Sequence, residues 1–176
     1  MVHSSAKQRL QQRGFSLVEM LLATVILLVG LVAIAQLVPA SILLNYNNRM
    51  DSSTLVFAQR QLDQILDQPI AATFFQDQLG NICQLGNPTP VNTIQGNNVL
   101  VSLSNQAVID FSQKVGVPGF SFVYPDPSGI TYDVRWAVIV TGNGATPASK
   151  RFILGVRQSA GNGFVLPVTL DTMVSR

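Results

Sequence analysis

Glu19 is the residue of this chain whose type and position most need a chemical explanation. Eight of the nine acidic residues are aspartates, and the single glutamate lies at the start of the most apolar stretch of the sequence. A carboxylate inside a membrane-spanning segment costs about 2.5–3.5 kcal/mol near the bilayer centre, and less toward its edge. The position of Glu19 therefore predicts a cationic partner.

Other side chains that could act as catalysts or ligands are few. The only histidine is His3 and the only cysteine is Cys83, so metal sites and catalytic triads lack their usual groups. We expect Cys83 to be a buried or half-buried thiol, with an intermolecular disulfide as the alternative. Asp126 and Asp133 are not spaced as a calcium loop or a catalytic pair, and we interpret them as turn and surface residues. The sequence predicts no metal, no cofactor and no enzymatic activity.

The positive charge of the chain is concentrated at its beginning. The formal net charge is +2, but Lys7, Arg9 and Arg13 precede the apolar stretch, and eight Lys and Arg then face nine acidic residues in the remainder. A nearly neutral remainder lacks the basic face that would hold a phosphate backbone. Binding to nucleic acid is therefore disfavoured.

Residues 20–44 form an uncharged run of 25 residues, long enough as a helix to cross a hydrocarbon core of about 30 Å. Because basic residues precede this run and none follows until Arg49, the positive-inside rule predicts a cytoplasmic N-terminus. One interpretation is a secretory signal peptide, since Ala33-Ile34-Ala35 fits a small-x-small cleavage site. A second is an uncleaved membrane anchor.

A third interpretation is cleavage between Gly14 and Phe15. Phe15 would then carry a cationic amine, and Glu19 would follow it by about one helical turn. A carboxylate there complements the positive end of the helix dipole. An ammonium group at the same end is disfavoured unless a carboxylate pairs with it. Of the three interpretations, only this one supplies Glu19 with a partner.

A family resemblance is carried by the segment Arg13-Gly14-Phe15-Ser16-Leu17-Val18-Glu19-Met20-Leu21-Leu22, which follows a short basic leader. This segment resembles the processing motif of type IV pilins and type II secretion pseudopilins. The resemblance implies that a prepilin peptidase cuts after Gly14, that the same enzyme N-methylates Phe15, and that Glu19 is needed for assembly. It also implies other partners: the lipid bilayer before assembly, an inner-membrane assembly machinery, and other pilins in a filament.

The apolar segment is more similar to minor pilins of the pilus modification type than to major pilins. Major pilins usually carry a proline at the twenty-second mature residue, which is Gln36 here, whereas this chain has Pro39. Gly30 also lies two places after the glycine that is common in major subunits. The resemblance thus implies a minor pilin that moves from the inner membrane to a periplasmic or cell-surface filament. A type II secretion pseudopilin and a ligand-binding or DNA-binding minor pilin are the alternatives.

The apolar pattern extends the predicted helix beyond the uncharged run, with apolar residues at helical spacing at Leu55, Ala58, Leu62, Ile65 and Leu66. We expect one helix from about Ser16 to Gln68, transmembrane in its first half and amphipathic in its second. The predicted division of the chain is a cleaved leader at 1–14, a transmembrane and assembly helix at 15–44, its amphipathic continuation at 45–68, and a head at 69–176.

The head is predicted to consist mainly of strands. We expect a connector at 70–90 with a short helix at 72–79, and strands at 99–104, 120–124, 130–141 and 151–158. The last two strands should pair antiparallel across a loop at 142–147. Alternation directs one set of side chains toward the helix, namely Tyr132, Val134, Trp136, Val138 and Val140, with Phe152, Leu154 and Val156 on a matching face. The fold class is α+β, and the resemblance implies a pilin fold, a long N-terminal helix on an antiparallel sheet.

Overall fold

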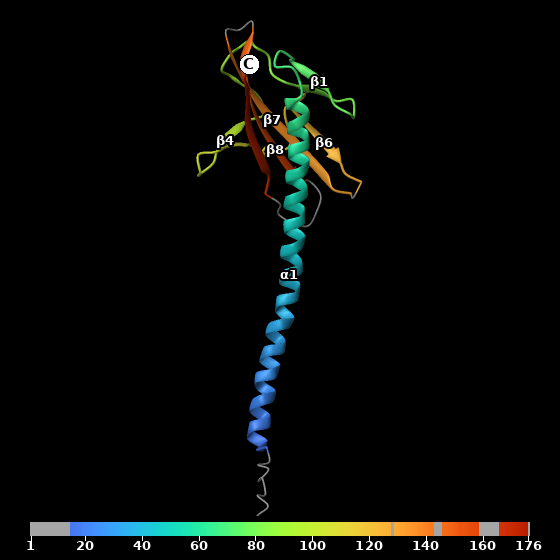
Figure 1. Ribbon diagram of the computed structural model, residues 1–176, viewed down its shortest axis with the longest axis vertical. Coiled ribbons are helices and arrows are strands. Elements are labelled where there is room, and N and C mark those ends of the chain that lie inside the picture. The colour runs from blue at the N-terminus through green and yellow to red at the C-terminus, as the bar shows by residue number, and fades with distance from the viewer. Residues whose placement is uncertain (1–14, 128, 143–145, 159–165, 176) are drawn as a thin grey trace, which may run out of the picture. The chain divides into compact units, whose positions relative to one another are not determined.

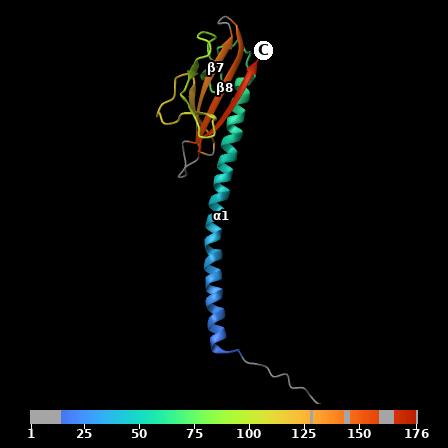
Figure 2. The ribbon, with the colours of Figure 1, turned by 90° about the vertical axis from the view of Figure 1, so that its left-hand side faces the viewer.

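The computed structural model describes residues 15–127, 129–142, 146–158 and 166–175 (Figures 1 and 2). The chain divides into two compact units between Asn45 and Tyr46. The predicted leader and residues 143–145 of the predicted loop at 142–147 lie outside the described residues.

The first described element is α1, one continuous helix from Leu17 to Leu66 (Figure 1). The predicted helix, from about Ser16 to Gln68, is confirmed. Pro39 lies inside the helix, where its ring removes one backbone donor without ending the helix. All side chains from residue 15 to residue 49 are exposed.

The second unit holds antiparallel strands in three sheets over the described residues. The strands are β1 (Phe74–Gln76), β2 (Ile82–Gln84), β3 (Ile94–Gly96), β4 (Val99–Val101), β5 (Ala107–Ile109), β6 (Ser121–Pro125), β7 (Thr131–Gly142), β8 (Pro147–Gln158) and β9 (Val168–Ser175). β1 pairs with β2, and β4 pairs with β5. The five-stranded sheet has the order β3-β7-β8-β9, with β6 also paired to β7. The structure is therefore α+β, as predicted.

β7 is the central strand of the large sheet. β3 pairs with its residues 137–139 and β6 with its residues 131–135, so the two short strands share one side of β7. The long β8 occupies the other side in a register that sets Trp136 opposite Leu154. The predicted antiparallel pair is confirmed.

The main core lies between the C-terminal part of α1 and one face of this sheet. Ala58 and Ile65 of α1 pack in one cluster with the predicted apolar faces of β7 and β8. The Phe57 ring stacks on Tyr132 with 4.3 Å between ring centroids. The indole nitrogen of Trp136 donates to the Gln84 carbonyl at 2.9 Å, which joins β2 to the sheet. The predicted aromatic-rich core is confirmed.

The opposite face of the sheet, called the outer face below, is covered in part by the hairpin of β4 and β5. Ile109 of this hairpin is buried with Ala137 and Ile153 in a second cluster. The close approach requires Gly155, because a Cβ added there would lie 2.7 Å from the Cβ of Ile109. The sheet is thus covered on both faces, which explains why β7 is buried along most of its length.

The predicted short helix at 72–79 is wrong. These residues form β1 and the first part of a tight turn to β2. The Asp77 carboxylate accepts hydrogen bonds from the backbone amides of Leu79 and Asn81, at 2.9 and 2.7 Å, and Gly80 adopts a positive φ of 85°. Aspartate and glycine favour such a turn over a helix.

Two further predictions need correction. Leu55 was predicted to face the sheet, but it is exposed, and the neighbouring Thr54 is buried at this turn of α1 instead. The predicted strand at 99–104 ends at Val101 instead. Its backbone turns where the Ser102 amide donates to the Gln106 carbonyl, at 2.8 Å, and Asn105 has a positive φ of 60°.

Lys150 is a buried cation that fastens the connector after α1 to the sheet. Its side chain lies on the α1 side of β8, and its ammonium group donates to the Ala72 carbonyl at 2.5 Å. Ile65, Phe152 and Val174 line the same hollow. Burial lowers the pKa of Lys150 from its ordinary value of 10.5, because the low-dielectric surroundings disfavour the charged form.

Replacing Lys150 with Met should change how the stability of the head depends on pH. Between the folded-state pKa of Lys150 and 10.5, the unfolded chain holds more protons than the folded chain, so this group makes unfolding less favourable as the pH rises. The free energy of unfolding of the wild type relative to Lys150→Met, measured by denaturant titration from about pH 7 to about pH 10.5, should therefore increase with pH. A difference that does not change with pH would contradict the lowered pKa of Lys150.

Candidate functional site

The N-terminal candidate site is built on the first turn of α1. Ser16 precedes the helix, and its carbonyl accepts a hydrogen bond from the Met20 amide at 3.1 Å. Ser16 thus occupies the N-cap position, and Glu19, three residues later, has the spacing of a capping box. The first turn presents backbone N–H groups and the positive end of the helix dipole, which favour a carboxylate at this place.

Phe15 and Glu19 lie at this turn, whereas Gly14 lies outside the described residues. Phe15 directly precedes the N-cap and is 79% exposed. Glu19 follows by four positions, a rise of about 6 Å along a helix. Within the described part of the chain, no cation forms an ion pair with Glu19. The carboxylate stands on an exposed apolar surface.

That apolar surface is long enough to cross a membrane. α1 passes this test by its length and composition, and none of its most apolar window of 18 residues is buried inside the chain. Each apolar side chain that stays in water forfeits roughly 1.5–3 kcal/mol of burial free energy. The first part of α1 therefore needs lipid or other protein surfaces around it.

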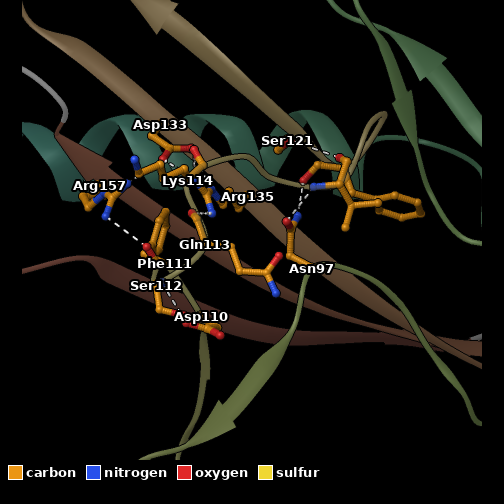
Figure 3. Close-up of polar contacts among 12 residues, drawn as sticks. Asn97, Asp110, Phe111, Ser112, Gln113, Lys114, Ser121, Asp133, Arg135 and Arg157 are labelled. Atoms are coloured by element: carbon orange, nitrogen blue, oxygen red, sulfur yellow. Dashed lines mark hydrogen bonds and ion pairs between the residues drawn. The ribbon is translucent and has the colours of Figure 1, made fainter.

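The outer face of the sheet also holds a cluster of charged side chains (Figure 3). Asp133 on β7 accepts two hydrogen bonds from the Arg135 guanidinium, at 3.0 and 2.9 Å, and one from Arg157 of β8, at 3.0 Å. Asp133 is 7% exposed and Arg135 is 2% exposed. The prediction that Asp133 is a surface residue is therefore wrong.

The segment after β5 covers this cluster. The Phe111 ring lies against both guanidinium groups, 5.1 Å from Arg135 and 4.8 Å from Arg157, measured to the ring centroid. Arg135 also donates to the Gln113 carbonyl at 2.8 Å, and Arg157 donates to the Phe111 carbonyl at 3.3 Å. Carbonyl dipoles and one carboxylate thus balance two cations, and the arrangement holds a loop rather than a ligand.

Asn97 fastens the other end of the same loop. Its side-chain oxygen accepts a hydrogen bond from the Val117 amide at 2.9 Å, and its side-chain nitrogen donates to the Phe120 carbonyl at 2.7 Å (Figure 3). Asn97 is buried. A buried amide with both ends bonded fixes the backbone around it, so the loop is held firmly at both ends.

The sequence analysis missed this cluster, although it contained a usable signal. The predicted pairing of strands 130–141 and 151–158 allows a register in which Asp133 faces Arg157, and this is the register observed. Opposite charges directly across a strand pair attract each other. What the sequence did not reveal is the cover provided by Phe111, which converts a surface pair into a buried one.

Cys83 lies on the α1 side of the sheet, close to the polar side chains of Tyr124 and Asp77. The Tyr124 hydroxyl donates to the Asp77 carboxylate at 2.7 Å. Burial, together with the negative charge of Asp77, raises the pKa of Cys83 to about 12. The thiol is therefore protonated and unreactive at neutral pH, and the predicted buried thiol is confirmed.

Among the described residues, no three His, Cys, Asp or Glu side chains are placed so that they could hold a metal ion. The ion-paired side chains of Asp133, Arg135 and Arg157 are engaged in holding the fold.

Comparison with known proteins identifies the N-terminal segment. Residues 9–35 match the family model for the prokaryotic N-terminal methylation motif. No curated protein and no solved structure matches the chain. This match, together with a helix long and apolar enough to cross a membrane, is consistent with a type IV pilin-like protein.

Replacing Asp133 with Asn should destabilise the head strongly. The change leaves two guanidinium groups without their shared carboxylate, and breaking a buried ion pair in this way costs about 3–5 kcal/mol. The matched control is Asp171→Asn, which breaks the more exposed pair of Asp171 with Arg151 and should cost at most about 1 kcal/mol. Equal losses in the free energy of unfolding for the two variants would contradict the role of Asp133 as the buried partner of Arg135 and Arg157.

Proposed function

We propose that this chain is a minor pilin, a structural subunit of a type IV pilus-like filament that assembles through α1. The observation that carries the proposal is the methylation motif at residues 9–35, with Glu19 in the first turn of an exposed apolar helix. The motif is a feature of structural subunits, and the proposed role needs no catalytic group and no cofactor.

Processing would create the partner that Glu19 needs. A prepilin peptidase hydrolyses the peptide bond between Gly14 and Phe15 with one water, leaving a carboxylate on Gly14 and an ammonium group on Phe15. The same enzyme then transfers a methyl group from a methyl donor to the Phe15 nitrogen, which releases one proton. The methylated amine stays cationic, so its attraction to a carboxylate persists.

The exposure of Phe15, directly before the helix, supports access of the peptidase to this bond. The Phe15 amine of one subunit and the Glu19 carboxylate of its neighbour attract each other strongly in an apolar environment. Such a pair would fix the axial register of two packed helices, since any other register leaves both charges unpaired. Glu19 thus acts in assembly, while the surrounding apolar residues supply the helix contacts.

The proposed division of the chain follows the same logic. Residues 1–14 form a cleaved leader, 15–44 the transmembrane and assembly helix, 45–68 its amphipathic continuation, and 69–176 the head. Before assembly the chain crosses the inner membrane once, with its N-terminus in the cytoplasm. An inner-membrane assembly machinery then transfers it to a filament with other pilins in the periplasm or at the cell surface.

The methylation motif equally supports a pseudopilin of a type II secretion system, which is the second candidate. Gly30, Gln36 and Pro39 favour the minor pilin, because they resemble the pilus modification type. A head that binds a ligand or DNA is a weaker candidate, since the exposed cations of the head are few.

Replacing Glu19 with Val should leave membrane insertion and cleavage intact and reduce incorporation into filaments about tenfold or more, because a lost partner leaves the Phe15 amine buried and unpaired. The measurement is the ratio of this subunit to the major subunit in sheared filaments from the native host, compared with its amount in membranes.

The matched control is Thr24→Val, which alters a second polar side chain on the same exposed part of α1. The Thr24 hydroxyl bonds to its own helix, to the Met20 carbonyl, so this variant should be incorporated normally. Incorporation of Glu19→Val at the wild-type level would contradict the assembly role of Glu19.

A further inference from the structure

We propose that Gln36 joins the uncharged part of α1, residues 20–44, to the same part of a second copy of this chain, through hydrogen bonds between the two Gln36 carboxamides. Gln36 lies inside this apolar run and is exposed on the helix surface. In the part of the chain that the structure describes, its carboxamide has no hydrogen-bond partner. A carboxamide has one carbonyl acceptor and two N–H donors, so all of these groups need partners from outside the chain.

The other two polar side chains of the run are satisfied within their own helix. The Thr24 hydroxyl donates to the Met20 carbonyl at 2.6 Å, and the Ser41 hydroxyl donates to the Val38 carbonyl at 2.9 Å. Hydroxyl groups bonded in this way need no further partner in an apolar environment. Among residues 20–44, all of which are described, Gln36 is the residue whose side-chain polar groups are left unpaired.

The depth of Gln36 in a membrane keeps its side chain away from water. At 1.5 Å per residue, Gln36 lies about 12 Å from the Leu44 end of the run and about 24 Å from the Met20 end. Helix side chains tilt toward the N-terminus, so the carboxamide is directed away from the nearer end of the run and toward the middle of the bilayer. Hydrocarbon offers neither donors nor acceptors, and an unpaired amide there is strongly disfavoured.

Pro39 leaves a second unmet group next to Gln36. Because proline has no N–H, the Ala35 carbonyl lacks the donor that residue 39 of a regular helix provides. This level of the helix therefore offers a partner two acceptors, the carbonyls of Ala35 and of the Gln36 side chain, together with two N–H donors.

A second copy of the same chain is the partner that these groups fit. Copies that cross one membrane in the same orientation hold Gln36 at the same depth. Two carboxamides are complementary to each other, because each donates an N–H to the carbonyl of the other. The contact is therefore symmetric, and the same residues serve on both sides.

The helix face around Gln36 lets two such helices approach closely. Ala33 lies three residues before Gln36 and Ala40 lies four residues after it, so the three side chains share one face. Val29 and Leu43 extend this face with the alternating spacing of three and four that pairs parallel helices. Small residues beside a polar one are the composition of contacts between helices in membranes.

The pairing rests on the proposed function in one respect, that α1 crosses the membrane. It requires neither cleavage after Gly14 nor a partner for Glu19, and it involves α1 alone. Membranes that contain neither prepilin peptidase nor other pilins are therefore sufficient to test it.

The test is disulfide cross-linking of the full chain in such membranes, in a Cys83→Ala background. Ala33→Cys should form dimers on mild oxidation, because closely packed helices bring Cα atoms within the roughly 4.4–6.8 Å that a disulfide spans. Adding Gln36→Leu should lower the initial rate of dimer formation about threefold to twentyfold, the effect of interhelical hydrogen bonds in membranes. Adding Gln36→Asn instead, which keeps a carboxamide, should preserve the dimers.

Two matched controls accompany these variants. Ser41→Ala, added to Ala33→Cys, removes a hydroxyl that is bonded within its own helix and should leave the rate unchanged. Leu31→Cys places the thiol two residues from Ala33, on the far side of the helix, and should not form dimers.

The pairing is overturned if Ala33→Cys forms no dimers, if Gln36→Leu leaves their rate unchanged, or if Leu31→Cys forms them equally well. It is also overturned if Ala33→Cys, in membranes of the native host, cross-links only to a different protein. Extraction with alkaline carbonate reports on the proposed function itself. Release of the chain from the membrane would contradict both the spanning helix and the pairing, whereas an inserted chain that forms no dimers contradicts the pairing alone.

Discussion

The structure depends on one constraint: the N-terminal part of α1 buries nothing against its own chain. None of its most apolar window is covered, and every side chain from residue 15 to residue 49 is exposed. An apolar helix of this length is stable only when lipid or other helices surround it. The same constraint explains why Glu19 matters, because a carboxylate that enters such surroundings must bring or find a cation. Cleavage before Phe15 would supply that cation one turn away.

The head shows how the second part of the same helix is stabilised by its own chain. The apolar stripe of α1, which includes Phe57, Ala58 and Ile65, lies against the aromatic face of β7. On the opposite face, the buried ion pair of Asp133 and Arg135 holds a loop. Both faces of the central strand are therefore covered within the chain. Among the described residues, β9 is the long strand that pairs with a neighbour on one side only.

Much of this arrangement could be predicted from the sequence, because strict periodicity leaves little choice. The alternation around Trp136 determined which face of β7 meets the helix, and the uncharged run followed by an apolar stripe predicted α1. Predictions failed where tertiary contacts or the side-chain bonds of a local turn decide the structure. Asp133 looks like a surface residue until Phe111 covers it, and residues 72–79 become a hairpin because Asp77 binds the amides of its own turn. β9 was not identified, since its apolar residues are interrupted by Asp171, whose partner Arg151 lies on the adjacent strand. The N-terminal site was found because its residues are consecutive, and the cluster in the head was missed because its residues come from distant segments.

The central claim is that cleavage at Gly14 creates the cationic partner of Glu19. Mass spectrometry of the N-terminal peptide of the protein, purified from membranes or filaments of its native host, tests this claim most directly. The account predicts a mature chain that begins at Phe15 and carries one methyl group on its amine. An intact chain that begins at Met1, or one that begins at Gln36 after signal-peptide cleavage, would contradict it.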